Sequence, residues 1–226
     1  MTDDVVVGAP RGVPIGTSDD LPPGAPGALL VIISGPSGVG KDTIIAALQA
    51  RDPDVGGDYH YVVTCTTRAP RPGEIPDVSY HFLTEDAFLR LREAGELLEA
   101  NEVHGNWYGT PRREVAEALA KGRDVILKID VQGARVVKER VPQALLVFIV
   151  PPTMEALFQR LRSRATETAD ELELRQRNAA IELARQGDYD RVVVNETGEV
   201  DRTAAEIEAI IAQEKRRNSD RRLRVV

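Results

Sequence analysis

Three glycines precede Lys41 in a short run that could bind phosphate, Gly35-Pro36-Ser37-Gly38-Val39-Gly40-Lys41-Asp42. The run follows an apolar, strand-like segment at 29–33 and precedes a helical pattern at 43–49. Glycine lets the backbone approach phosphate oxygens, the N–H groups at the start of the helix point at them, and the lysine adds a positive charge. The sequence therefore predicts a site for a nucleoside triphosphate.

One position departs from the usual phosphate loop. Ser or Thr normally follows the lysine and offers its hydroxyl to Mg²⁺, whereas this chain has Asp42 and then Thr43. A carboxylate is also a competent ligand for Mg²⁺, so we expect Asp42 to replace the hydroxyl, directly or through water. Thr43 or water alone is the alternative ligand, and a glycine-rich turn that binds no phosphate is the alternative to the site itself.

A second set of side chains could hold a phosphate monoester. Arg68 and Arg71 lie three residues apart in a proline-constrained loop, which can direct both forked cations at one phosphate. Tyr80 and Tyr108 can add phenolic O–H donors to the same oxygens. The alternative for the two arginines is an ordinary solvated loop.

Glu99 has the chemistry to read a purine base. Guanine presents N1–H and N2–H donors beside its O6 acceptor, whereas adenine presents the lone pair of N1. A carboxylate accepts from both guanine donors, and the hydroxyl of Thr64 or Thr110 can donate to O6. Such a site can reject a mismatched base by roughly 10⁴-fold. A surface carboxylate on an amphipathic strand is the alternative for Glu99.

An acid and a group of cations complete the candidate residues. Asp130 follows a strand-like segment at 125–129, and open parallel sheets place their ligand groups at the carboxyl ends of strands. We expect Asp130 to act near Mg²⁺ or the monophosphate. Arg160 and Arg164 share one helix face, and Arg175 follows across a short linker, as in a mobile lid. A solvated helix face is the alternative for each arginine.

The elements that must position these residues alternate along the chain. Strands are expected at 28–34, 61–66, 124–129, 144–150 and 191–194. Helices are expected at 43–50, 85–93, 112–121, 153–164, 169–186 and 200–216, with Thr153 as an N-cap. The alternation predicts an α/β fold with a central parallel sheet flanked by helices, which the segment 68–108 interrupts as an inserted substrate-holding subdomain.

The composition favours one soluble domain with flexible ends. The chain has 226 residues, of which 42% are hydrophobic and 29% are charged. Residues 1–27 are rich in Pro, Gly and Asp and predict a disordered tail, and the basic end 215–226 predicts a solvated, frayed helix end rather than an anion-binding tail. The single Cys65 excludes an internal disulfide and is expected to be a small core residue.

Charge and hydropathy limit the partners. A formal charge of −7 argues against a general nucleic-acid binder. No apolar run is long enough to span a membrane, and the acidic first residues do not match a secretory or transit peptide, so we expect a cytoplasmic protein. The sequence gives no prediction of the oligomeric state.

The run Thr64-Cys65-Thr66-Thr67-Arg68-Ala69-Pro70-Arg71-Pro72-Gly73-Glu74, followed by Tyr80-His81-Phe82, resembles the nucleotide-monophosphate site of guanylate kinases. The resemblance covers about residues 28–214 and includes Glu99, the runs 105–110 and 129–133, and the arginines of 160–175. It implies a P-loop kinase fold with a GMP-binding insertion at about 60–112 and a helical lid at about 160–186. The implied reaction transfers a phosphoryl group from ATP to GMP with Mg²⁺.

The resemblance also implies a role for each candidate residue. The catalytic residues would be Lys41, Arg160, Arg164 and Arg175. The ATP site would comprise Gly35, Pro36, Ser37, Gly38, Val39, Gly40, Lys41, Asp42, Thr43 and Asn195, with Asn195 near the ATP base. The expectation that Asp42 is the metal ligand comes from its carboxylate and not from the resemblance. The GMP site would comprise Thr64, Arg68, Arg71, Tyr80, Glu99, Tyr108, Gly109, Thr110 and Asp130.

Lys128 stands where the family usually has a second acid, two residues before Asp130. We expect Lys128 to offset the added negative charge of Asp42, and independent drift of the two positions is the alternative. Two other functions remain open. Kinases that form ribose 1,5-bisphosphate resemble this fold and also carry a Gly-Lys-Asp loop, and non-catalytic guanylate-kinase-like interaction modules have lost the phosphate loop that this chain keeps.

Overall fold

The protein is built on a parallel sheet of five strands with the order β2-β7-β1-β8-β9. The computed structural model describes residues 21–52, 58–103, 105–162 and 169–225, without the side chains of 169–172. The strands are β1 (Leu30–Ser34), β2 (Tyr59–Tyr61), β7 (Asp124–Lys128), β8 (Leu145–Val150) and β9 (Arg191–Val194). The predicted α/β fold with a parallel central sheet is confirmed.

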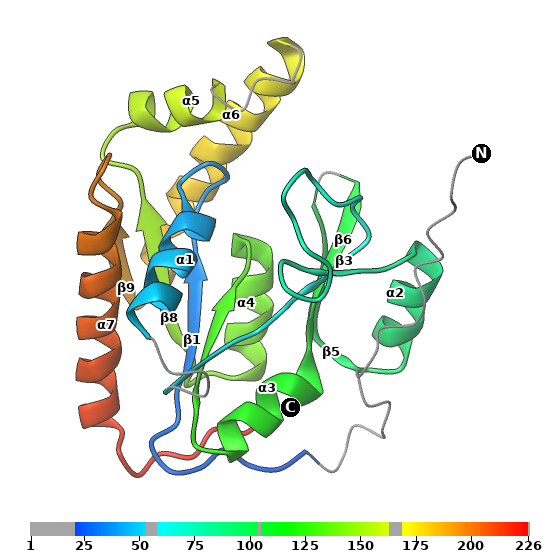
Figure 1. The fold of residues 1–226 in the computed structure, drawn as a ribbon, viewed down its shortest axis with the longest axis vertical. Coiled ribbons are helices and arrows are strands. Elements are labelled where there is room, and N and C mark those ends of the chain that lie inside the picture. The colour runs from blue at the N-terminus through cyan, green and yellow to red at the C-terminus, as the bar shows by residue number, and fades with distance from the viewer. Residues whose placement is uncertain (1–20, 53–57, 104, 163–168, 226) are drawn as a thin grey trace.

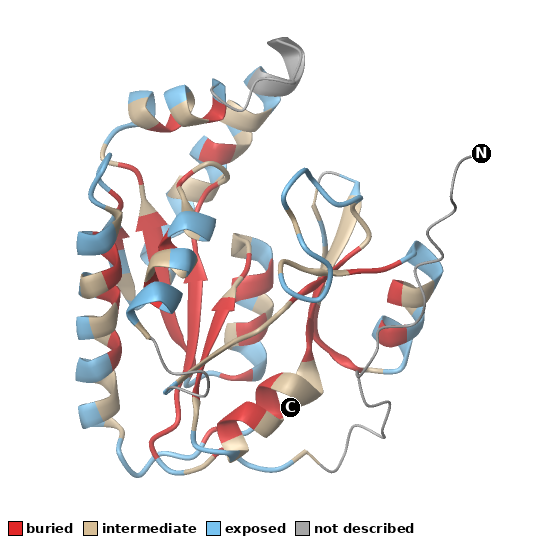
Figure 2. Ribbon diagram, in the orientation of Figure 1, coloured by how far each residue is buried: buried red, intermediate tan, exposed pale blue. Residues whose placement is uncertain are grey.

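Helices cover both faces of this sheet. On one face lie α1 (Lys41–Arg51), α5 (Met154–Arg162), α6 (Ala169–Leu183) and α7 (Val200–Arg217). On the other face lie α3 (Arg112–Ala120) and α4 (Val131–Arg140). Strand β1 is buried on both sides, because Val31 and Ile33 pack toward the first group and Leu30 and Ile32 toward the second (Figure 2). Burial on both faces is why β1 is continuously apolar in sequence.

A second, smaller sheet of order β4-β3-β6-β5 stands beside the first (Figure 1). Its strands are β3 (Cys65–Thr66), β4 (His81–Phe82), β5 (Leu97–Val103) and β6 (Asn106–Pro111), and α2 (Glu85–Glu93) packs beside them. All five elements lie within 60–112, and β3 and the end of β6 extend beyond the segment 68–108. It has its own small core, in which Cys65 is fully buried, as predicted. Figure 1 shows α5 and α6 above the upper end of the main sheet and this insertion to its right.

Two elements differ from the sequence expectation. The single strand predicted at 61–66 is divided between β2 in the main sheet and β3 in the insertion, because a uniform β-branched run does not show where the chain changes sheets. Helix α4 was not predicted, since its first turns contain Gly133 and several valines of low helix propensity. Asp130 caps it by accepting a hydrogen bond from the Gly133 N–H at 2.7 Å.

The two chain ends also differ from the expectation of flexible tails. The N–H groups of Gly24 and Gly27 donate to the carbonyls of Leu223 and Arg221 at 2.8 and 2.9 Å. Leu223 and Val225 are 1% and 4% exposed and pack in the core with α3. A few apolar residues in a basic segment are too weak a compositional signal to predict this packing, and residues 1–20 lie outside the described part. No helix among the described residues is long and apolar enough to cross a bilayer.

Candidate functional site

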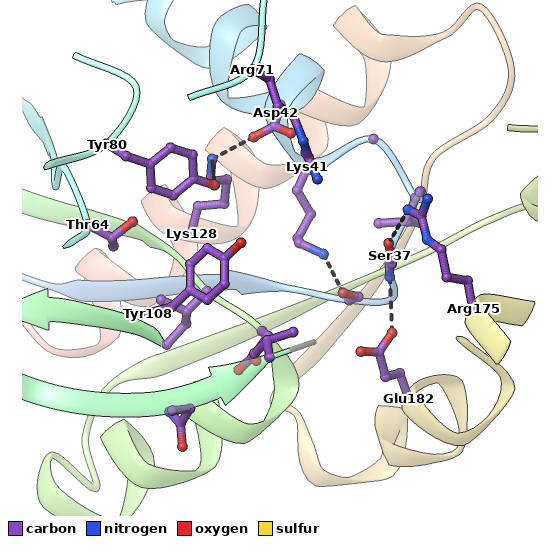
Figure 3. Close-up of a pocket in the computed structure, with 18 of the residues that line it drawn as sticks. Ser37, Lys41, Asp42, Thr64, Arg71, Tyr80, Tyr108, Lys128, Arg175 and Glu182 are labelled. Atoms are coloured by element: carbon purple, nitrogen blue, oxygen red, sulfur yellow. Dashed lines mark hydrogen bonds and ion pairs between the residues drawn. The ribbon is translucent and has the colours of Figure 1, made fainter. Parts of the chain in front are cut away.

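A pocket of about 550 Å³ opens where β1 and β7 end, between the phosphate loop, the insertion and α6 (Figure 3). Most predicted site residues line it: Gly35, Ser37, Gly38, Val39, Gly40, Lys41, Asp42, Thr64, Arg71, Tyr80, Glu99, Tyr108, Asp130 and Arg175. Residues with no predicted role line it too: Asn101, Val103, Ile129, Leu174 and Glu182. Lys128, which was expected to offset the charge of Asp42, also lines the pocket. One cavity therefore joins the predicted triphosphate and monophosphate sites.

The phosphate loop is held in part by hydrogen bonds between its own residues. The Lys41 ammonium donates to the carbonyls of Gly35 and Pro36 at 2.5 and 3.1 Å. Burial lowers the pKa of Lys41, while the carboxylates of Glu182, Asp42 and Asp130 oppose that shift. Gly40 has φ of 100°, a conformation that side-chain-bearing residues rarely adopt.

Two predicted site residues brace this loop from outside the pocket. Asn195 is 6% exposed, and its Nδ2 donates to the Val39 carbonyl at 2.8 Å. A Cβ at Gly40 would lie 2.6 Å from that same Nδ2. Arg160 donates from Nη1 to the Val39 carbonyl and from Nη2 to the Asn195 carbonyl, at 3.2 and 3.0 Å. Both side chains thus position the loop, and the roles predicted for Asn195 in the ATP site and for Arg160 in catalysis stay predictions.

Helix α6 contributes a cation and a carboxylate. Arg175 donates from Nη2 to the Ser37 hydroxyl at 2.9 Å, and the Ser37 N–H donates to Glu182 Oε2 at 3.0 Å (Figure 3). A carboxylate oxygen thus accepts a loop hydrogen bond that a phosphate oxygen could accept. Glu182 was missed from the sequence. Its spacing of seven residues from Arg175, about two helical turns, is the signal that could have found it. Arg164 lies outside the described residues.

Glu99 lies at the other end of the pocket, where hydrogen bonds orient its carboxylate. It is 3% exposed, and its Oε1 accepts from the Thr110 hydroxyl while its Oε2 accepts from Asn101 Nδ2, both at 2.7 Å. Burial raises the pKa of the Glu99 carboxyl to about 7. The missed residue Asn101 is two positions along the same strand, so it lies on the same face. A Cβ at Gly133 would lie 2.9 Å from Oε2, which explains a glycine inside α4.

The predicted monophosphate residues divide into two groups. Arg71, Tyr80 and Tyr108 line the pocket, whereas Arg68 does not. Arg68 donates from Nη2 to both oxygens of Glu74 at 2.8 and 3.0 Å and from Nε to the Tyr108 hydroxyl at 3.2 Å. The structure thus uses Arg68 to position Tyr108 and the proline-rich loop.

Several other predicted residues lie beside the pocket and do not line it. They are Pro36, Thr43, Gly109 and Thr110. Thr43 is exposed on α1, and Thr110 acts through its hydrogen bond to Glu99. A Cβ at Gly109 would meet Phe88 and Leu97 at 2.9 Å, so this glycine serves close packing in the insertion.

Asp42 and Lys128 form an ion pair, with Nζ 2.5 Å from Oδ1 (Figure 3). The Lys128 ammonium also lies 3.4 Å from the Tyr80 hydroxyl. The contact joins the two positions at which the sequence departs from the guanylate kinase pattern. The described residues contain no group of three or more His, Cys, Asp or Glu side chains that could hold a metal on their own.

Comparison with known proteins supports the resemblance seen in the sequence. The chain matches the family profile of guanylate kinase over residues 28–214. It is 47% identical to a guanylate kinase of Symbiobacterium thermophilum over 86% of this chain and 90% of that protein. It is 45% identical to a guanylate kinase of Mycobacterium tuberculosis over 80% of this chain and 88% of the relative.

The fold comparison agrees with the sequence comparison. The crystal structure of guanylate kinase from Anaplasma phagocytophilum matches with a TM-score of 0.65 and 33% identity, covering 83% of this chain and 86% of the other. The relatives therefore share both the phosphate-loop half and the insertion of this molecule. On these grounds the chain belongs to the guanylate kinase family, whose activity is phosphoryl transfer from ATP to GMP.

Proposed function

We propose that the single pocket holds ATP and GMP end to end, with the phosphoryl group passing between them where β1 and β7 end. Lys41 and the loop of residues 35–40 would hold the β- and γ-phosphates of ATP. Arg71, Tyr80 and Tyr108 would hold the GMP phosphate, and Glu99 with Thr64 would hold guanine. The substrates ATP and GMP make the cytoplasm the expected compartment.

The observation that carries this proposal is the buried Glu99 in the same pocket as the phosphate loop. Its two oxygens are oriented by Thr110 and Asn101, so a planar base with two adjacent N–H donors matches it. A sugar-phosphate acceptor has no pair of adjacent N–H donors that such a carboxylate could bind. A non-catalytic interaction module has no need for Lys41 and its phosphate loop.

Asp42 would hold Mg²⁺ together with phosphate oxygens and water. Mg²⁺ commonly takes only one or two protein carboxylates and completes its shell with phosphates and water, and Asp42 lines the pocket beside Lys41. The metal would neutralise charge on the β- and γ-phosphates. Asp130 caps α4, so its part in this proposal is to orient the helix whose Gly133 makes room for Glu99.

Catalysis would rest on positioning and electrostatics. The loop N–H groups and Lys41 fix the donor, Arg71 and the two tyrosines fix the acceptor, and both are in place before reaction. Arg175 on α6 already contacts Ser37, and closure of this helix would add its charge to the transferring group and exclude water.

The proposal is tested by measuring ADP formation with GMP, AMP and a ribose 1-phosphate-type acceptor in parallel. We expect turnover with GMP to exceed turnover with the other acceptors by orders of magnitude. Preference for the sugar phosphate would replace the proposal with the ribose 1,5-bisphosphate activity. A folded chain that binds GMP but forms no ADP with any acceptor would be an interaction module.

A further inference from the structure

Lys128 is brought to the phosphate loop by the sheet and not by local sequence. It pairs with Ile33 in the parallel register of β7 and β1, one residue before the end of β1. Asp42 is the second residue of α1, which follows the loop that begins where β1 ends. Strand register therefore places two residues 86 positions apart in contact at 2.5 Å.

The lysine is the member of this ion pair that needs the partner. Its side chain is 23% exposed, whereas that of Asp42 is 70% exposed and can be solvated by water. A desolvated ammonium requires an anion, while an exposed carboxylate does not require a cation. Burial by itself would lower the pKa of Lys128, but Tyr80 and Asp42 raise it above its ordinary value, so Lys128 remains charged.

Lys128 also lies between the two halves of the pocket. On one side is Asp42, next to Lys41 of the donor site. On the other side is Tyr80, whose hydroxyl is 3.4 Å from Nζ and whose ring centroid is 5.0 Å away. An ammonium has three N–H donors that can be redirected at low cost, so a phosphate dianion beside Tyr80 can draw Nζ from Asp42.

We propose that Lys128 binds the phosphate of GMP, and that Asp42 holds the ammonium in place until the nucleotide arrives. The proposal rests on the proposed function, because it takes GMP as the acceptor. It adds a cation from the main sheet to the acceptor site, beside Arg71 and Tyr80 of the insertion. No covalent step is involved, since Lys128 exchanges one anionic partner for another.

The test compares the binding of GMP with that of guanosine by calorimetry, because only GMP carries the phosphate. Lys128→Met should weaken GMP binding by about 10-fold or more and leave guanosine binding unchanged, as expected for a lost charged hydrogen bond. Lys128→Gln, which is about one bond shorter but keeps an N–H donor without the charge, guards against misfolding of the first variant. The matched control is Lys138→Met, because Lys138 also pairs with an aspartate, Asp190 at 3.0 Å, but outside this pocket.

Asp42→Asn separates this proposal from simple charge compensation. If Lys128 only offsets Asp42, then Lys128→Met in an Asp42→Asn background should bind GMP as well as Asp42→Asn alone, and the proposal is overturned. If Lys128 binds the phosphate, the double variant keeps the loss seen in Lys128→Met.

The outcomes also distinguish this proposal from the proposed function. GMP-dependent ADP formation by the wild type, together with unchanged GMP binding in both folded Lys128 variants, overturns only the role of Lys128. GMP binding that depends on Lys128, without ADP formation by the wild type, supports the contact and contradicts the reaction. A wild type that binds no GMP contradicts both.

Discussion

The phosphate loop and the pocket around Glu99 are built in opposite ways. The loop is a run of consecutive residues whose backbone makes the site, and buried side chains such as Asn195 support it from behind. The Glu99 pocket is made of side chains from β5 and β6, and Gly133 of α4 leaves room for the carboxylate. Glu99 is fixed there by the side chains of Asn101 and Thr110. A change in the loop should therefore alter the reaction rate, whereas a change at Glu99 should alter the choice of base.

The largest effect is expected at Lys41. Lys41→Met should lower kcat by at least about 10²-fold with the fold retained, because it removes a charge contact to the phosphates and not a packing group. Steady-state kinetics with GMP and circular dichroism measure the two properties. Lys121→Met, at the exposed end of α3, is the control. Near-normal kinetics in folded Lys41→Met would show that the loop does not contribute to catalysis. The functional contrast between the loop and the Glu99 pocket would then not hold.

Glu99→Gln should change selection more than rate. The amide turns an N–H₂ group toward the guanine donors or must flip, so KM for GMP should rise by roughly 10- to 100-fold and discrimination against AMP should weaken. KM for ATP should remain near its wild-type value. Unchanged KM values for GMP and AMP would mean that another group reads the base.

The same carboxyl predicts a pH dependence. Burial raises the pKa of Glu99 from about 4.5 to about 7, so the folded protein binds more protons than the unfolded chain between these values. The free energy of unfolding should therefore fall as the pH rises through this window. Guanine needs the ionised form, and guanosine has no phosphate that titrates in this range. Guanosine binding should therefore tighten between pH 6 and 8, and Glu99→Gln should abolish this dependence. Calorimetric titration across that range measures it.

The sequence predicted the loop better than the pocket because the loop is local. Spacing and the flanking strand and helix predicted the loop from Gly35 to Lys41, and apolar patterning predicted β1, β7, β8 and β9 of the main sheet. It did not reveal that Asn101 holds Glu99, that Arg68 is occupied by Glu74, or that Asn195 and Arg160 lie behind the loop. Those contacts depend on which distant segments the fold brings together. The sign of a side chain's charge does not show whether the side chain binds substrate or supports another part of the protein.

Substitutions of Arg160 and Arg175, the two predicted lid arginines that the structure describes, should have different effects. Arg175→Ala should lower kcat by about 10-fold with little change in thermal stability, because Arg175 reaches the pocket from α6. Arg160→Ala should lower the melting temperature and raise KM for ATP, because it removes two bonds that fix Val39 and Asn195. Thermal unfolding and steady-state kinetics of both variants check this. If both substitutions lowered kcat equally and left stability equal, the result would support the lid role predicted for Arg160.

The smallest effect is expected at Glu182, which reaches the phosphate loop from α6. Its carboxylate accepts a hydrogen bond from the Ser37 N–H at 3.0 Å, and of the carboxylates that raise the pKa of Lys41 it has the largest effect. A phosphate that enters the loop competes for the same donor, and two anions close together repel. Glu182→Gln keeps the shape and an acceptor but removes the charge. It should therefore tighten binding of ADP in the absence of Mg²⁺ by roughly 5-fold, since charged and neutral hydrogen bonds differ by about 1 kcal/mol.

Calorimetry on Glu182→Gln measures this, with Glu173→Gln as the control, because Glu173 lies on the same helix but pairs at the surface with Arg177. Weaker ADP binding in Glu182→Gln would show that the carboxylate aids the loop, for instance by keeping Lys41 charged against its burial. The loop would then depend for phosphate binding itself, and not only for its bracing by Asn195 and Arg160, on a side chain from a distant segment. The contrast between a backbone-built and a side-chain-built site would not hold.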